Sequence, residues 1–127
     1  MNKKIFAANW KMYLNSNESR EFMSKINANK DFFSMFDIMI FPSHIAISIV
    51  QDLAKDLDNI KIGMQDCDAL TYGAVTGSNS ITSHKIDSCI VGHSERRTIF
   101  NENDRPLEGI WIIENSDYHK GGYVFSF

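Results

Sequence analysis

The sequence is poor in cysteine, proline and glycine. Its 127 residues include two Cys, two Pro and seven Gly, which excludes collagen-like and low-complexity chains. The two cysteines, Cys67 and Cys89, are too few and too far apart for a disulfide framework or a Cys-x-x-Cys metal motif. Without an export signal, we expect both to be reduced thiols in a cytoplasmic protein.

A strong charge of one sign and a long apolar run are lacking as well. Thirteen Lys and Arg against sixteen Asp and Glu give a net charge of -3, so we expect no nucleic-acid partner. No apolar run reaches the roughly 18 residues of a membrane span, and the apolar stretch near the start is too short for a signal peptide. We therefore expect no membrane partner. The four histidines lack the i, i+3 or i+4 spacing of a zinc-binding helix, and no metal site is predicted.

The sequence does contain the composition and periodicity of a single folded domain. Hydrophobic residues make up 43% and charged residues 23%, close to the average of soluble globular proteins. Short apolar runs, each typical of a strand buried on both faces, occur at residues 4–9, 36–41, 60–65 and 88–92. Helical patterns separate them. This alternation predicts an α/β fold with a parallel sheet and right-handed crossovers.

The helical patterns have recognisable starts. Ser16 or Asn17 can cap a first helix, which runs to about Asn27. Ser43 can cap a second helix, whose apolar residues recur at spacings of three and four as far as Leu57. Residues 66–79 are rich in Gly, Thr, Asp and Asn and predict a long loop, and a short helix is expected over residues 80–85.

The first of three chemistry-bearing motifs is Asn9-Trp10-Lys11, directly after the first strand. Ligands of parallel α/β folds bind at the carboxyl ends of the strands. A lysine there can attract an anionic substrate, and an amide can fix a carbonyl or hydroxyl group. Taken alone, the motif is more typical of a solvated lysine beside a strand-end asparagine.

The second motif is Gly92-His93-Ser94-Glu95-Arg96-Arg97, after the fourth strand. Ser94 can cap a helix, and Glu95 suits its first turn. A helix N-terminus beside His93 favours the neutral imidazole, which can donate a hydrogen bond to a developing oxyanion. Taken alone, a capped helix with a structural histidine explains the motif at least as well. The third motif, over residues 73–78, is on composition a flexible glycine loop.

In their order along the chain and in the spacings between them, the three motifs resemble the triosephosphate isomerase family over residues 4 to about 104. The resemblance implies a (β/α)₈ barrel that interconverts dihydroxyacetone phosphate and glyceraldehyde 3-phosphate without a cofactor, in glycolysis and gluconeogenesis. It implies that Asn9 and Lys11 contact the triose phosphate substrate. It also implies that His93 is the electrophile that polarises the carbonyl, and that Glu95 is an active-site residue that supports Lys11.

The resemblance also implies a homodimer. Thr76 corresponds to the residue that inserts into the neighbouring subunit, and Arg96 and Glu102 are expected at the same interface. Two residues depart from the family pattern: Ser78 stands where the family usually has Glu, and Asp66 where it often has Asn. Because that Glu normally pairs across the interface with the first arginine of the motif, we expect Arg96 to be less well partnered there.

The chain is short for such a barrel, which typically takes roughly 250 residues. We expect residues 1–104 to form a half-barrel of about four βα units and residues 105–127 to be an unmatched tail. In the tail, residues 116–127 predict a turn and a short aromatic strand, which could form a hairpin with residues 105–115. The family's catalytic base on strand six, its lid and its phosphate loops would then be absent, so the chain alone should be inactive or weakly active. Three explanations fit the short length: a fragment of a longer protein, a reading-frame change near residue 104, or a shortened variant that assembles differently.

Two other functions stay open. A non-catalytic half-barrel that binds a partner chain would use its open strand edges, because unpaired edges invite pairing. Another barrel acting on phosphorylated sugars could share the motifs, although the Gly-His-Ser-Glu-Arg-Arg string makes this the weaker alternative.

Overall fold

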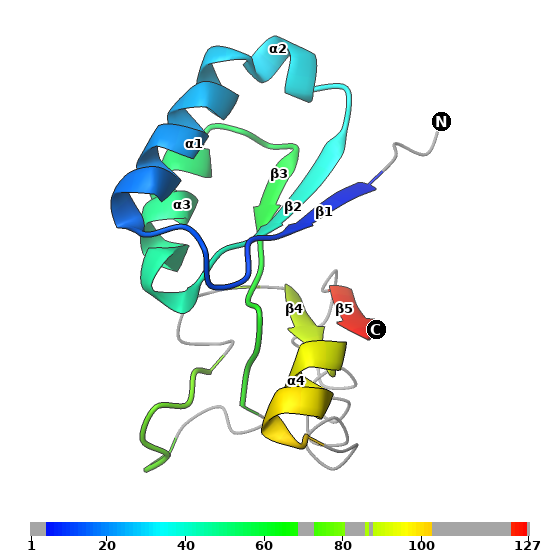
Figure 1. Cartoon of the computed structure of the whole chain (residues 1–127). Helices are drawn as coiled ribbons and strands as arrows, with labels where there is room; N and C mark the ends of the chain where they lie inside the picture. The colour runs from blue at the N-terminus through cyan, green and yellow to red at the C-terminus, as the bar shows by residue number, and fades with distance from the viewer. Residues whose placement is uncertain (1–4, 69–72, 81–85, 87, 103–122, 127) are drawn as a thin grey trace. The chain divides into compact units, whose positions relative to one another are not determined.

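The structure is a computed structural model that describes residues 5–68, 73–80, 86, 88–102 and 123–126, the last four as backbone (Figure 1). Contacts along the chain divide it into two compact units, Met1–Gln65 and Asp66–Phe127. No helix in the described ranges is both long and apolar enough to cross a membrane.

The first unit is built on a three-stranded parallel sheet. The strands are β1 (Ile5–Asn9), β2 (Asp37–Phe41) and β3 (Ile60–Ile62), in the spatial order β1-β2-β3. The central strand β2 is buried from Ile38 to Phe41, which explains its unbroken apolar sequence. The first three predicted strands are confirmed, although β3 ends three residues earlier than predicted.

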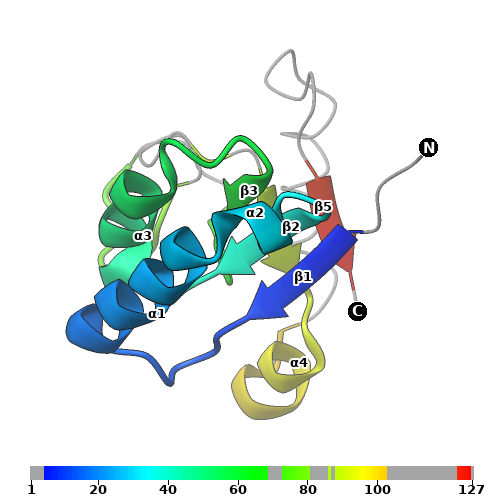
Figure 2. The same cartoon turned by 90° about the horizontal axis from the view of Figure 1, so that it is seen from above.

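Helices cover one face of this sheet (Figures 1 and 2). They are α1 (Ser16–Ala28), α2 (Lys30–Phe33), the 3₁₀ turn η1 (His44–Ala46) and α3 (Ile47–Ala54). The core between helices and sheet consists of one buried cluster, made of Trp10, Met23, Ile26, Ile38, Ile40, Ala46, Val50, Ala54, Leu57 and Ile60. Ile38 and Ile40 belong to it and Met39 does not, as the alternation of side chains along a strand requires.

The cap of α1 is Asn15, so the prediction of Ser16 or Asn17 was wrong. The side chain of Asn15 accepts hydrogen bonds from the backbone N–H groups of Asn17 (2.9 Å) and Glu18 (3.0 Å). The Glu18 carboxylate in turn accepts from the Asn15 N–H at 2.9 Å. This reciprocal capping box satisfies N–H groups that the first turn of a helix leaves without partners.

We expect Asn15→Ala to lower the free energy of unfolding by about 0.5–2 kcal/mol, because the first turn of α1 loses its acceptor. Asn17→Ala is the matched control, since its side chain makes no capping contact, and it should change stability by less than about 0.5 kcal/mol. Urea unfolding followed by circular dichroism measures both. Equal losses in the two variants would show that Asn15 is not the cap.

The second helical pattern begins differently from the prediction. Ser43 stands at the N-cap position of η1, but its side chain makes no capping hydrogen bond. The chain passes through one 3₁₀ turn and becomes α-helical only at Ile47. The regular helix ends at Ala54, and the buried Leu57 lies beyond it. The apolar spacing correctly indicated the buried face and overestimated the length of the helix.

The second unit contains the fourth predicted strand and the helix after it. β4 (Ser88–Val91) pairs in parallel with β5 (Tyr123–Ser126), and α4 (Ser94–Phe100) follows β4. The short strand expected in the tail is confirmed, and its observed pairing is parallel to β4. The partner expected from residues 105–115 and the short helix expected over residues 80–85 lie outside the described residues, except for Ser80.

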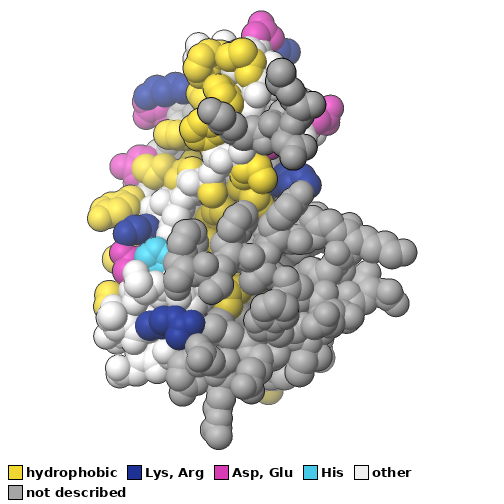
Figure 3. All heavy atoms as spheres, turned by 90° about the vertical axis from the view of Figure 1, so that its right-hand side faces the viewer, with side chains coloured by type: hydrophobic (Ala, Val, Ile, Leu, Met, Phe, Trp, Pro, Cys, Tyr) yellow, Lys and Arg dark blue, Asp and Glu magenta, His cyan; other side chains and the backbone are white. Residues whose placement is uncertain are grey.

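All pairings between described strands are parallel, so the α/β class is confirmed. A half-barrel of four βα units stays a prediction. One edge of the first sheet carries apolar side chains at the surface, because Ile5 and Phe6 of β1 are each about half exposed. Figure 3 shows hydrophobic side chains at the surface on this side of the molecule. Open edges of this kind can pair with another strand.

Candidate active site

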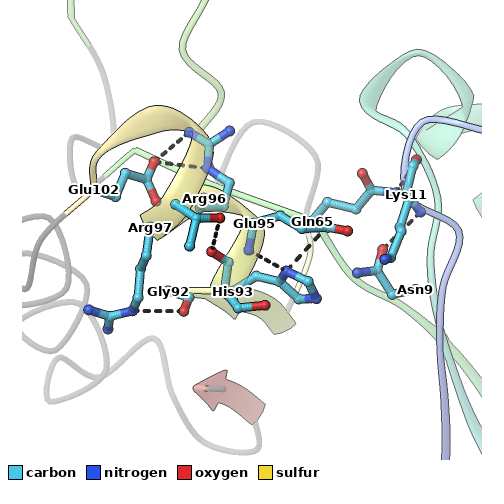
Figure 4. Close-up of polar contacts among 11 residues, drawn as sticks. Asn9, Lys11, Gln65, Gly92, His93, Glu95, Arg96, Arg97 and Glu102 are labelled. Carbon is cyan, nitrogen blue, oxygen red and sulfur yellow. Dashed lines mark hydrogen bonds and ion pairs between the residues drawn. The ribbon is translucent and has the colours of Figure 1, made fainter.

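Asn9 and Lys11 form a compact turn at the carboxyl end of β1 (Figure 4). The backbone N–H of Lys11 donates to Oδ1 of Asn9 at 2.9 Å. Lys11 has a φ of 52°, a left-handed conformation that is uncommon outside glycine. Between them, Trp10 is buried and its ring packs edge-to-face on Phe22 at 5.0 Å. The buried indole anchors the turn, and the side chain of Lys11 stands at the surface.

Gln65 is a positioning residue that the sequence analysis missed. Its side-chain Nε2 donates to the carbonyl oxygen of Lys11 at 2.7 Å and to that of Phe41 at 2.9 Å. It thereby ties the turn after β1 to the end of β2. A signal was present, because Gln65 follows the third strand at the same carboxyl edge as Asn9 and Phe41. Its role depends on two carbonyl groups whose positions only the fold defines.

His93 stands at the N-terminus of α4 and is its N-cap, so the prediction of Ser94 as the cap was wrong. The backbone N–H of Glu95 donates to Nδ1 of His93 at 3.2 Å. Because Nδ1 then uses its lone pair, the ring proton of a neutral His93 lies on Nε2. Oε2 of Glu95 is 3.4 Å from the same Nδ1. The imidazole is about one-fifth exposed.

The backbone before His93 makes a sharp left-handed turn at Gly92, whose φ of 65° favours glycine. The carbonyl oxygen of Gly92 accepts a hydrogen bond from Nε of Arg97 at 3.0 Å. Arg97 therefore fixes the turn that connects β4 to His93 (Figure 4).

Arg96 is well partnered within its own unit, and its weaker pairing across a subunit interface stays a prediction. Its Nη2 lies 3.2 Å from Oδ2 of Asp66, and Nε donates to Oε1 of Glu102 at 2.9 Å. Nη2 also contacts Oε1 of Glu102, and the guanidinium lies 4.6 Å from the centre of the Phe100 ring. The hydrogen bond to Glu102 raises the pKa of Arg96 most, and the charge of Asp66 adds to it while burial opposes it. The aspartate that departs from the family pattern thus supplies a carboxylate to this arginine.

Thr76 lies on an exposed turn in the described part of the long loop. The turn is closed by a hydrogen bond from the Ser78 N–H to the carbonyl oxygen of Val75 at 3.2 Å. Gly77 has a φ of 86° and open space around its Cα, so the conformation and not crowding favours glycine there. An exposed tip suits a contact with another subunit, and the interface role of Thr76 stays a prediction.

The structure brings together the members of each motif. Asn9 and Lys11 belong to the first unit, and His93, Glu95 and Arg96 to the second. The support of Lys11 by Glu95 stays a prediction for that reason. Among the residues that the structure describes, no three His, Cys, Asp or Glu side chains gather as they would around a metal ion.

Both cysteines are free and buried in the second unit. A hydrogen bond to the thiol of Cys67, together with burial, raises the pKa of Cys89 well above its ordinary range. Cys89 therefore stays protonated, and only the thiolate is an effective nucleophile. We assign it to the packing of β4 and not to the chemistry of the site.

Comparison with known proteins gives the same family as the motifs. The family model described as triosephosphate isomerase matches residues 4–110 of the chain. A triosephosphate isomerase of Bdellovibrio bacteriovorus is 39% identical over 107 residues, which cover 80% of this chain and 43% of the relative. One of Latilactobacillus sakei is 34% identical over 110 residues, or 84% of this chain and 43% of the relative.

The chain belongs to the triosephosphate isomerase family. A further member, from Flavobacterium psychrophilum, is 35% identical over 130 aligned positions, which cover 100% of this chain and 51% of the relative. The chain spans about half the length of the curated triosephosphate isomerases that it matches. The family match extends to residue 110, and the division of the chain at residue 104 stays a prediction.

Proposed function

We propose that this chain carries the carbonyl-polarising and anion-binding part of a triosephosphate isomerase active site. The reaction would be the interconversion of dihydroxyacetone phosphate and glyceraldehyde 3-phosphate, in the cytoplasm and without a cofactor. The observation that carries the proposal is the hydrogen bond from the Glu95 N–H to Nδ1 of His93. It leaves Nε2 of a neutral imidazole as a hydrogen-bond donor at the carboxyl end of a strand in a member of this family.

The chemistry requires such a donor. Isomerisation removes a proton from the carbon next to the carbonyl group, and negative charge then develops on the carbonyl oxygen. An N–H donor fixed before the reaction stabilises that charge without reorganisation. His93 is held by the first turn of α4, and the adjacent Glu95 carboxylate can stabilise the ring if it takes up a second proton. The same residue can therefore donate a hydrogen bond and relay a proton between the two oxygens.

Lys11 would supply positive charge for the substrate phosphate and the developing enediolate. Its backbone is held on both sides, by Asn9 through the N–H and by Gln65 through the carbonyl oxygen. A lysine whose backbone is fixed loses less conformational entropy when its ammonium group binds an anion. The side-chain amide of Asn9 also has an NH₂ group, which could donate to a substrate oxygen.

The proposed site needs further groups beside Asn9, Lys11, His93 and Glu95. The resemblance implies that the proton-abstracting base comes from the sixth strand of the barrel. We therefore propose that turnover requires the second half of a barrel, and that the chain by itself is inactive or nearly so. A homodimer formed through Thr76, Arg96 and Glu102 belongs to the same proposal, and the intact carboxylate partners of Arg96 are compatible with it.

A coupled assay for glyceraldehyde 3-phosphate formation tests the proposal. The chain is mixed with the C-terminal half of the Bdellovibrio relative, beginning after the segment that aligns with this chain. We expect no turnover from either part alone and measurable turnover from the mixture. A stable mixed complex without turnover would contradict the proposal and favour the partner-binding alternative. Full turnover by the chain alone would contradict the need for a second half.

A further inference from the structure

Helix α4 depends on polar contacts for its position. It has seven residues, and none of them is buried. Helices this short are not stable in isolation, and most helices in proteins are held by the packing of an apolar face. Because α4 lacks a buried face, the polar side chains that attach it to the rest of the unit determine where it sits.

Arg96 makes the attachment in the first turn of the helix. Its backbone N–H donates to the carbonyl oxygen of His93 at 2.9 Å, which closes the turn that His93 caps. Its guanidinium is then shared between two carboxylates, Asp66 at 3.2 Å and Glu102. Glu102 lies just after α4 and holds Arg96 from within the same segment. Asp66 is the first residue of the long loop, so this ion pair ties α4 to a distant part of the sequence.

The geometry of His93 depends on the same turn. Its Nδ1 accepts from the Glu95 N–H, and this contact requires the backbone of residues 93–96 to hold its helical shape. If the turn frays, the amide N–H no longer faces Nδ1, and the neutral ring is free to carry its proton on either nitrogen. A contact that holds Arg96 therefore also holds the protonation pattern of His93.

We propose that Asp66 is a positioning residue for His93. Its ion pair with Arg96 fixes the first turn of α4, so that Nδ1 stays on the Glu95 N–H and the ring proton stays on Nε2. This inference deepens the proposed function and rests on it, because it concerns the residue that would polarise the carbonyl. It assigns a role to an aspartate that stands where the family often has asparagine.

Nitrogen NMR of the histidine ring tests the proposal on the full chain without substrate. The resonances of His93 are assigned by their loss in His93→Gln. In the unchanged chain we expect Nδ1 and Nε2 to be well separated in chemical shift, as in a single tautomer. In Asp66→Asn we expect the two shifts to move towards each other. Amide exchange of Arg96 and Arg97 should become roughly twofold to fivefold faster, the range for a part-exposed ion pair.

Two further variants complete the test. Asp66→Glu keeps the charge and should restore most of the separation between the two ring nitrogens. Asp52→Asn removes an exposed charge of the same kind from α3 and should leave His93 unchanged. If Asp66→Asn does not fold, a His93 tautomer in Asp66→Glu that matches the unchanged chain supports the proposal, and a mixed tautomer contradicts it.

Other outcomes overturn the proposal. Unchanged ring shifts and unchanged exchange in Asp66→Asn would show that Asp66 does not position His93. If amide exchange in Asp66→Asn rises equally in β4 and α4, Asp66 has a general structural role and does not specifically position His93. Since the readout needs neither substrate nor a second half of the barrel, this proposal can fail while the isomerase assay succeeds, and the reverse also holds.

Discussion

Replacing His93 by glutamine is expected to lower isomerase turnover by roughly 10²- to 10⁴-fold, the usual contribution of a positioned acid or base. The glutamine amide can still donate an N–H hydrogen bond to a substrate oxygen. It cannot take up and return a proton as an imidazole can, so the relay between the two oxygens is lost. The measurement is the coupled assay on the complemented chain, with turnover and KM determined separately.

His44→Gln is the matched control, because it makes the same substitution in η1 of the first unit. We expect it to leave turnover within about twofold of the unchanged chain, as is usual for substitutions outside special features. Circular dichroism must show that both variants fold alike. Equal activity in His93→Gln and His44→Gln would remove His93 from the chemistry and with it the main support for the proposed function.

Met23→Ala is expected to destabilise the first unit by about 2–5 kcal/mol, because it leaves a cavity in a packed core. Met23 has no exposed surface and belongs to the cluster that joins α1 to the sheet. Single domains are stable by only about 5–15 kcal/mol, so this loss is large enough to populate the unfolded state. Urea unfolding measures it through the fluorescence of Trp10, with Trp111→Phe as the background so that Trp10 is the only reporter.

The same substitution at an exposed position provides the comparison. Met12 is 94% exposed, so Met12→Ala should change the free energy of unfolding by less than about 0.5 kcal/mol. Both variants remove the same atoms from the side chain, and only burial differs between them. Similar losses at the two positions would mean that Met23 does not lie in the core that the structure describes.

The sequence predicts the strands better than the ends of the helices. β2 is recognisable because a continuous apolar run ends at Pro42, and burial on both faces requires such a run. The cap of α1 was misplaced because three cap-forming residues stand together at positions 15–17. Only the glutamate three positions after Asn15 distinguishes it. α2 has four residues, which is too short for a helical period to be visible.

The sequence predicts which residues belong to the candidate site, but it does not predict the contacts that hold them in place. Asn9, Lys11 and His93 follow strands, where ligands of parallel sheets bind, and their motifs are specific to the family. The partners that hold them depend on the fold. Gln65 acts on carbonyl groups of two other chain segments, and Asp66 acts on an arginine 30 positions later in the sequence. No local pattern contains that information.

Lys11 and Asn101 both have a left-handed backbone conformation, but the local sequence explains only that of Asn101. Among the described residues, Lys11 and Asn101 are the non-glycine residues with positive φ. Asn101 ends α4, and asparagine is tolerated at such a helix end, so local chemistry accounts for it. Lysine has no such tolerance, and glycine would adopt the same turn without strain. The turn after β1 therefore holds a lysine in a conformation that costs backbone energy, and strained residues of this kind cluster at active sites and ligand clamps.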